Sequence, residues 1–149
     1  MREFIHYGHK EFDREIFENI KNWAIHSKPK GGLWASDIKA KYGWKDWCKG
    51  EDFRECHTDN SFVFSLKPNT RILTINKVSD LEKLPRFKTE MFDASIWYSL
   101  DFEQISKDYD IMEVNISKDP DLYWKLYGWD CDSIVVMNPD VVVVKKSVK

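Results

Sequence analysis

The sequence predicts an α+β fold in a chain of 149 residues. Short strand-like segments occur in both halves of the chain, and segments with helical spacing lie between them. Hydrophobic residues make up 42% of the sequence, which is enough for a core. No linker, internal repeat or low-complexity tract divides the chain, so we expect a single domain over residues 1–149.

The first part of the chain combines a strand, a helix and a glycine turn. Residues 3–7 form a short strand, and apolar side chains at helical spacing predict an amphipathic helix over residues 13–25. A proline and two glycines make residues 27–32 a loop. The apolar Leu33 and Trp34 then begin a buried strand.

A broken helix and a polar stretch follow. Ser36 and Asp37 supply N-cap chemistry for a short helix that carries Tyr42. This helix breaks at a glycine and resumes over residues 44–49. Residues 51–60 are polar without a period and are expected to form a surface loop.

The centre of the chain predicts a β-hairpin. Ser61–Leu66 alternates in polarity, residues 67–70 place Pro and Asn at the central turn positions, and residues 71–75 form a second strand. We therefore expect the two strands to pair with each other. Ser79 then caps a short helix that Pro85 ends.

The last third of the chain alternates helices with strands. The predicted helices are residues 101–107, with Phe102 and Ile105 facing inward, and a short helix opened by Asp119-Pro120 and ended by Gly128. The predicted strands are residues 110–116, 132–137 and 141–144, the last two joined by a turn at residues 138–140.

Composition narrows the function classes. The net charge is -2, with 23 basic and 25 acidic residues, so no global field attracts nucleic acid. The longest apolar run is far too short to span a bilayer, and the N-terminus lacks the apolar segment of a secretory leader. Three widely spaced cysteines argue against a disulfide framework. We expect a cytoplasmic protein without a membrane partner.

Familiar catalytic and metal-binding motifs are absent from the sequence. It contains no G-x-S-x-G, no G-x-x-x-x-G-K, no G-x-G-x-x-G and no H-E-x-x-H. Cys48, Cys56 and His57 could supply three metal ligands, but no C-x-x-C pair and no evident fourth ligand accompany them. We therefore expect no metal site.

His6 is the first candidate for a ligand role. It lies in the predicted first strand next to Tyr7, and strand alternation places the two side chains on opposite faces. Two interpretations stay open for His6. Either it contacts a ligand, or it is a core histidine whose ring is satisfied by a backbone carbonyl.

Three short motifs follow one another in the first part of the chain. They are HYG at residues 6–8, GGLWAS at residues 31–36 and KAKY at residues 39–42. Their order and spacing resemble those of the ADP-ribosyltransferases of the His-Tyr-Glu class, and DSIVVMNPDVVV at residues 132–143 looks like the late strands of that fold. The resemblance implies an ADP-ribosyltransferase-like split β-sandwich with short flanking helices.

The resemblance assigns NAD-binding roles to five residues. His6 would hydrogen-bond a ribose hydroxyl of NAD, and the Tyr7 backbone would hold the nicotinamide amide. Trp34 and Tyr42 would sandwich the nicotinamide ring, whose flat cationic form suits aromatic faces. Ser36 would add a polar contact to the amide or the ribose. A plain core role for Trp34 and a helix-packing role for Tyr42 stay open.

The catalytic carboxylate departs from the family pattern. Ser133 stands where the family has Glu, and a hydroxyl cannot supply the charge that stabilises an oxocarbenium-like transition state. The candidates are Asp132, Glu113 and Asp130. Asp132 would face the other side of a regular strand from Ser133, and Asp130 would reach the site from a loop. Glu113 is a costly charge inside an apolar strand, or it lies on the exposed face of an edge strand.

The resemblance implies an NAD-dependent mono-ADP-ribosyltransferase that releases nicotinamide and modifies a macromolecule, with protein favoured over nucleic acid. A toxin, a bacterial or phage effector and a regulatory enzyme all fit these residues. The missing Glu leaves a second function open, a catalytically degenerate binding module or an inhibitor of a host protein. A third, an RNA 2′-phosphate transferase of the related His-His type, would rely on His9 and Arg71.

Overall fold

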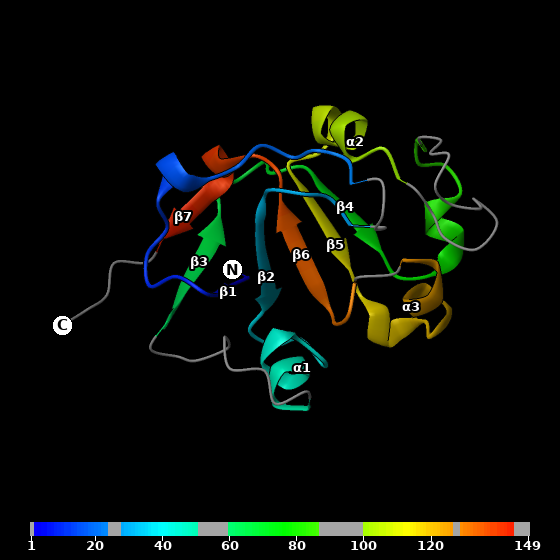
Figure 1. Cartoon of the computed structure of the whole chain (residues 1–149), viewed down its shortest axis with the longest axis horizontal. Helices are drawn as coiled ribbons and strands as arrows, with labels where there is room; N and C mark the ends of the chain where they lie inside the picture. The colour runs from blue at the N-terminus through cyan, green and yellow to red at the C-terminus, as the bar shows by residue number, and fades with distance from the viewer. Residues whose placement is uncertain (1, 24–27, 51–59, 87–99, 127–128, 145–149) are drawn as a thin grey trace.

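The computed structural model describes residues 2–23, 28–50, 60–86, 100–126 and 129–144. Seven strands form one sheet in the order β4-β5-β6-β2-β1-β3-β7, with short helices around it (Figure 1). The strands are β1 (Phe4–Tyr7), β2 (Leu33–Asp37), β3 (Ser61–Leu66), β4 (Ile72–Ile75), β5 (Ile111–Val114), β6 (Ser133–Val136) and β7 (Val142–Val144). The α-helices are α1 (Trp44–Gly50), α2 (Phe102–Asp108) and α3 (Asp121–Lys125), and single 3-10 turns occur at Arg14–Ile16, Val78–Leu81, Ile116–Lys118 and Pro139–Val141. The predicted α+β class is confirmed.

The middle of the sheet is built from strands that lie far apart in the sequence. β6 pairs with β5 on one side and with β2 on the other, and β1 pairs with β2 and β3. All of these pairs are antiparallel, whereas β4 and β5 are parallel. Every residue of β5 and of β6 is buried, with one apolar cluster over one face of these strands and a second over part of the other face.

Helices cover one face of the sheet. Met112 of β5 and Val135 of β6 belong there to one cluster with Phe102 of α2 and Leu122 of α3. The opposite face is covered at one end by the N-terminal segment around Phe17. The other end of that face carries the polar cleft described below.

The predicted hairpin is wrong, although both of its strands and its turn form. β3 pairs with β1 and β7, whereas β4 lies at the opposite edge of the sheet and pairs with β5. Asn69 has a φ of 67°, as a tight turn allows. The carboxylate of Asp110, just before β5, accepts hydrogen bonds from the backbone N–H and the guanidinium of Arg71. This contact holds the start of β4 beside β5, and no local pattern reveals it.

The predicted helix over residues 13–25 is also wrong. Among its described residues only Arg14–Ile16 forms a 3-10 turn, and the rest is not helical. The backbone of this segment is hydrogen-bonded to the glycine turn instead, since the Gly32 N–H donates to the carbonyl oxygen of Glu18 at 2.8 Å. Ile20 is buried in the helix-covered cluster. Tertiary packing therefore buries apolar side chains here without a helix.

The helix predicted to begin at Ser36 and Asp37 does not form. Both residues belong to β2, residues 38–42 contain two turns, and the helix begins only at Trp44. The buried Ser36 hydroxyl donates to the carbonyl oxygen of Asp132 at 2.8 Å and accepts the Trp44 N–H at 2.9 Å. The Ser36 hydroxyl therefore accepts a backbone N–H at the start of α1, as the side chain of a helix cap does, although Ser36 itself lies in β2.

The later elements form close to their predicted positions. Asp101 caps α2 by accepting the Gln104 N–H, and Phe102 and Ile105 are buried as predicted. The helix expected from Ser79 is a single 3-10 turn. The short apolar strands that become β5, β6 and β7 all form within a few residues of their predicted bounds.

Some predictions fall on residues outside the described part of the chain. These are most of the loop at residues 51–60, the helix end at Gly128, and Cys56 and His57 of the rejected metal site. Within the described ranges, no three side chains of the metal-binding types lie together. None of the described helices has the length and apolar character needed to cross a membrane.

We expect Gly32→Ala to destabilise the fold more than Gly8→Ala. Both glycines have positive φ, 74° and 118°, and a side chain there costs about 1–2 kcal/mol. At Gly32 a Cβ would also lie 2.7 Å from Val135 Cγ2 and 2.9 Å from the Val136 carbonyl oxygen, whereas at Gly8 the nearest atom is 3.6 Å away. Urea unfolding measures both losses. Equal losses would mean that the turn does not approach β6 this closely.

Candidate functional site

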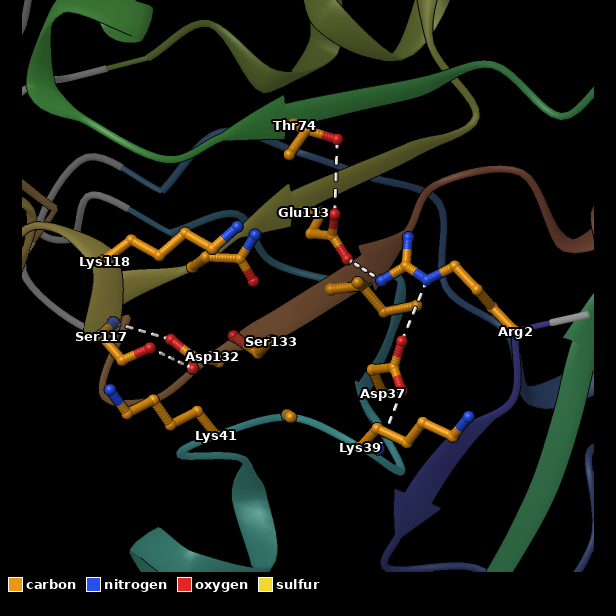
Figure 2. Close-up of a pocket in the computed structure, with 13 residues that line it drawn as sticks. Arg2, Asp37, Lys39, Lys41, Thr74, Glu113, Ser117, Lys118, Asp132 and Ser133 are labelled. Carbon is orange, nitrogen blue, oxygen red and sulfur yellow. Dashed lines mark hydrogen bonds and ion pairs between the residues drawn. The ribbon is translucent and has the colours of Figure 1, made fainter.

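An open cleft of about 780 Å³ lies on the sheet face opposite α2 and α3. Four neighbouring strands and the loops that join them supply its walls (Figure 2). The charged lining residues are Arg2, Asp37, Lys39, Lys41, Glu113, Lys118 and Asp132, and the polar ones are Thr74, Asn115, Ser117 and Ser133. The cleft therefore combines buried carboxylates with a cationic rim.

Strand alternation makes this part of the sheet face polar. Thr74, Glu113 and Ile134 form one cross-strand row over β4, β5 and β6. Asn115 and Asp132 lie two residues further along the same face. In the opposite direction the next row is apolar and packs in the core. The face thus changes from apolar to polar along the strands, and the cleft lies over the polar end.

Glu113 is a buried carboxylate with a fixed charge partner. Its carboxylate accepts one hydrogen bond from the Arg2 guanidinium and another from the Thr74 hydroxyl at 3.3 Å (Figure 2). Arg2 also donates to Asp37 at 2.9 Å, so one guanidinium bridges β5 and β2. Burial alone would lower the pKa of Arg2, but the two carboxylates outweigh it and raise that pKa. The alternative of an exposed edge position for Glu113 is wrong, because β5 has a neighbour on each side.

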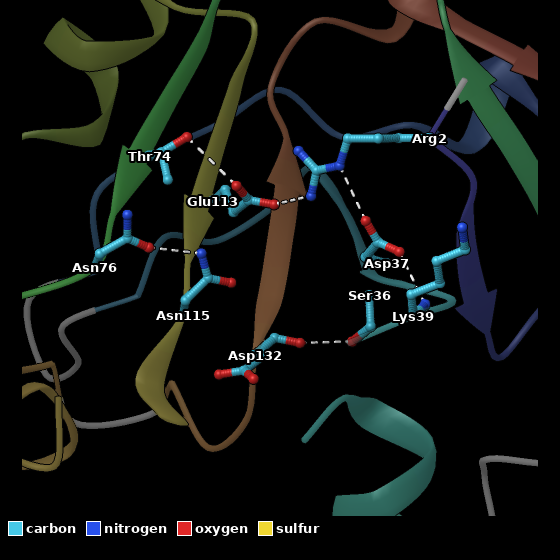
Figure 3. Close-up of polar contacts among 9 residues, drawn as sticks. All are labelled: Arg2, Ser36, Asp37, Lys39, Thr74, Asn76, Glu113, Asn115 and Asp132. Carbon is cyan, nitrogen blue, oxygen red and sulfur yellow. Dashed lines mark hydrogen bonds and ion pairs between the residues drawn. The ribbon is translucent and has the colours of Figure 1, made fainter. Parts of the chain in front are cut away.

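Asp132, just before β6, joins three parts of the chain. Its carboxylate accepts the Ser117 N–H at 2.8 Å, the Ser117 hydroxyl at 2.6 Å and the Tyr42 N–H at 3.2 Å. Its own N–H donates to the Tyr42 carbonyl at 2.7 Å, and its carbonyl accepts the Ser36 hydroxyl (Figure 3). Asp132 is 4% exposed. It therefore fastens the loops after β2 and β5 to the start of β6.

Ser133 and Asp130 contribute less to the cleft. Ser133 lines it, but the Ser133 hydroxyl donates to the Cys131 carbonyl at 3.1 Å. Asp130 is not among the lining residues described for the cleft. Burial, reinforced by the charges of Asp130 and Asp132, raises the pKa of the free Cys131 thiol, so that this thiol stays protonated and unreactive.

Cys48, in α1, differs from the expectation drawn from cysteine spacing. It is disulfide-bonded, whereas Cys131 is free. Disulfides are uncommon in reducing compartments. The bond at Cys48 therefore does not support the expected cytoplasmic location.

His6 lies outside the cleft and has the contacts of a core histidine. Its Nδ1 is 2.6 Å from the Trp34 carbonyl oxygen, so Nδ1 carries the proton, and Nε2 accepts from His9 Nδ1 at 3.0 Å. The ring packs against Phe62 with centroids 5.1 Å apart. The hollow beside it measures only about 80 Å³. Burial lowers the pKa of His6, the Trp34 carbonyl opposes that effect, and His9 adds to it.

The other four predicted NAD contacts are distributed around the second strand. Trp34 packs edge-on against Trp129, with centroids 4.7 Å apart, beside the helix-covered cluster. Tyr7 and Ser36 line a second hollow of about 540 Å³ next to α1. Burial and the charge of a neighbouring aspartate raise the pKa of Tyr7. The Tyr42 side chain is 38% exposed.

The structure thus brings two of the three candidate carboxylates together and leaves the predicted NAD contacts apart from them. None of those five contacts is among the lining residues described for the cleft. Sequence reasoning missed Arg2, Ser117 and Lys118, which have no motif around them. Lys39 and Lys41 were visible as alternating cations within the KAKY motif, a signal that could have indicated an anion site.

We expect the free energy of unfolding to fall as the pH is lowered, because His6 becomes protonated. Its pKa in the folded protein is below the ordinary 6.5, so the unfolded chain binds the proton more readily. The stabilisation by neutral His6 is complete above pH 6.5 and is lost as the pH falls below it. Urea unfolding at pH 7 and pH 5 measures the change. His6→Gln should reduce this dependence of the free energy of unfolding on pH, and His9→Gln, as the control, should retain more of it. An equal change between pH 7 and pH 5 in His6→Gln and in the unaltered protein would contradict the assignment.

We expect Asp132→Asn to destabilise the protein by about 1–3 kcal/mol, because an amide NH₂ cannot accept hydrogen bonds and would lie buried against the part-buried donors of Ser117 and Tyr42. The exposed Asp121 provides the control. Asp121→Asn should change the free energy of unfolding by less than about 1 kcal/mol. Denaturant unfolding compares the two variants, and similar small losses would contradict the joining role of Asp132.

Comparisons of the chain with protein-family models, with curated proteins and with solved structures give no match. Function must therefore be argued from the sheet and the cleft.

Proposed function

We propose that the protein is an NAD-dependent mono-ADP-ribosyltransferase with an ADP-ribosyltransferase-like fold. The observation that carries the proposal is the order of strands in the sheet. β1 with His6, β2 with Trp34 and β6 with Ser133 are neighbours in the order β6-β2-β1. These are the three strands on which the family resemblance places its conserved residues, and a shared site requires them to be adjacent.

Glu113 is the carboxylate that we assign to catalysis. It lies on β5 and pairs with Ile134 of β6, the residue after Ser133, which stands at the family's Glu position and pairs with Val114. Its carboxylate lines the cleft, whereas the Asp132 carboxylate already accepts three hydrogen bonds from the protein. A buried negative charge would stabilise the oxocarbenium-like ribose as nicotinamide leaves C1′. The acceptor nucleophile would then bond to C1′ from the opposite face and give up its proton to solvent.

The resemblance assigns the NAD contacts to His6, Tyr7, Trp34, Ser36 and Tyr42, which lie outside the cleft. Tyr7 and Ser36 line the neighbouring hollow, and Asp37 and Ala40 line both, so NAD bound there would extend past them to Glu113. Since both ring nitrogens of His6 have partners, a ribose hydroxyl would have to replace His9 at Nε2. His9 is exposed, so its ring would turn into solvent as the hydroxyl binds. NAD is a substrate here, consumed in each turnover.

A catalytically degenerate binding module is the second candidate, and two observations favour it. Ser133 stands at the family's Glu position and bonds to a backbone carbonyl, and Arg2 already neutralises Glu113. A site of this kind could retain NAD or a protein partner without turnover.

Nicotinamide release from NAD, measured with and without cell lysate, tests the proposal. We expect release to rise with lysate, and Glu113→Gln to reduce it by at least about 100-fold while NAD binding by calorimetry is retained. The exposed Glu82 provides the control, and Glu82→Gln should release nicotinamide normally.

Binding of NAD without release would select the degenerate module. Neither binding nor release would overturn both candidates. Unchanged release in Glu113→Gln would remove Glu113 from the mechanism.

A further inference from the structure

The charges around the cleft do not cancel locally. Arg2 pairs with both Asp37 and Glu113, and the Asp132 carboxylate is satisfied by neutral donors. Lys39, Lys41 and Lys118 also line the cleft, and within the described part of the chain none of them forms an ion pair. The three ammonium groups outnumber the two carboxylate charges that remain, one in the Arg2 cluster and one on Asp132, so the cleft lining carries a net charge of +1 that attracts an anion.

Two of these cations flank Asp132. Figure 2 shows Lys41 and Lys118 on either side of the contact between Asp132 and Ser117, at the end of the cleft away from Arg2. Lysine side chains bind phosphate groups as flexible point charges. Two ammonium groups against the single carboxylate of Asp132 give this end of the cleft a net positive charge, which suits a phosphate group.

The uncharged lining limits what else the ligand can contain. No aromatic side chain occurs among the described lining residues, so no ring platform is available for stacking a base. Asn115 donates its amide NH₂ to Asn76 at 2.8 Å, which fixes its orientation and turns its carbonyl oxygen away from Asn76 (Figure 3). That oxygen and the Ser117 and Thr74 hydroxyls suit the hydroxyl groups of a sugar.

We infer that the cleft binds a sugar phosphate, and that this group belongs to the acceptor in the proposed transferase reaction. The assignment to the acceptor rests on the proposed function, whereas the binding site does not. The cleft volume of about 780 Å³ lies within the range of small-molecule sites, roughly 300–1,000 Å³. An acceptor hydroxyl next to Glu113 would bond to C1′ of NAD as the C1′–nicotinamide bond breaks, and its proton would pass to solvent.

A sugar phosphate reaches the cleft from one of two sources, a free metabolite or the backbone of a nucleic-acid strand. Calorimetric titrations of the full chain without NAD distinguish them, with ribose 5-phosphate and a 5′-phosphorylated oligoribonucleotide as probes. Ribose and inorganic phosphate serve as partial probes. We expect the intact sugar phosphate to bind more tightly than either part, and the tighter of the two main probes to identify the source.

Lys41→Gln/Lys118→Gln tests the site directly. We expect the Kd for the tighter probe to rise at least tenfold, whereas Lys10→Gln/Lys83→Gln, two exposed lysines away from the cleft, should leave the Kd unchanged. Thermal unfolding of both double variants checks that the fold is retained. No binding of either main probe, or the same loss in both double variants, would overturn the inference.

Nicotinamide release remains a separate measurement. A protein that binds ribose 5-phosphate but neither binds nor consumes NAD retains the site and loses the transferase. Displacement of ribose 5-phosphate by NAD would assign the cleft to the donor and overturn the acceptor role.

Discussion

The hydrogen bonds of Asp132 connect the cleft to the rest of the fold. One residue joins the loop after β2, the turn after β5 and the start of β6 through its carboxylate and its backbone. The Ser36 hydroxyl extends this network to the first turn of α1. A buried carboxylate is tolerable only when such donors replace its water. The position of the cleft floor therefore depends on Asp132.

Arg2 has a comparable role at the other end of the cleft. Its guanidinium bridges Asp37 of β2 and Glu113 of β5, across the intervening β6. Because Arg2 is itself about half exposed, solvent weakens this bridge compared with a fully buried pair. Asp132 and Glu113 are thus held by different means, Asp132 by neutral donors and Glu113 by a cation that solvent can reach.

Local patterns were sufficient where the determinants are close in sequence. The inward spacing of Phe102 and Ile105 in α2, the alternation of Ser61–Leu66 and the β-branched run before Asn138 each predicted an element that forms. The helix over residues 13–25 and the hairpin failed because distant partners decide those regions, the glycine turn in one case and Asp110 in the other.

The candidate site was predictable to a similar extent. Glu113 and Asp132 were visible as charges beside apolar strands, and the structure places both in one cleft. Arg2 and Lys118 gave no such signal, because they approach the cleft only through the order of strands in the sheet.

That order also bears on how the chain reaches its native state. No neighbouring pair in the sheet is joined by a tight hairpin within the described part of the chain: even β5 and β6 are separated by α3, and β3 must pair with both β1 and β7. Each pairing requires closure of a long loop before contacts compensate for the lost entropy. Folding of such a topology is slow for its size. Until the central strands pair, their apolar side chains are open to association with other chains. The strand order that builds the cleft therefore also makes assembly of the sheet the stage at which aggregation competes with folding.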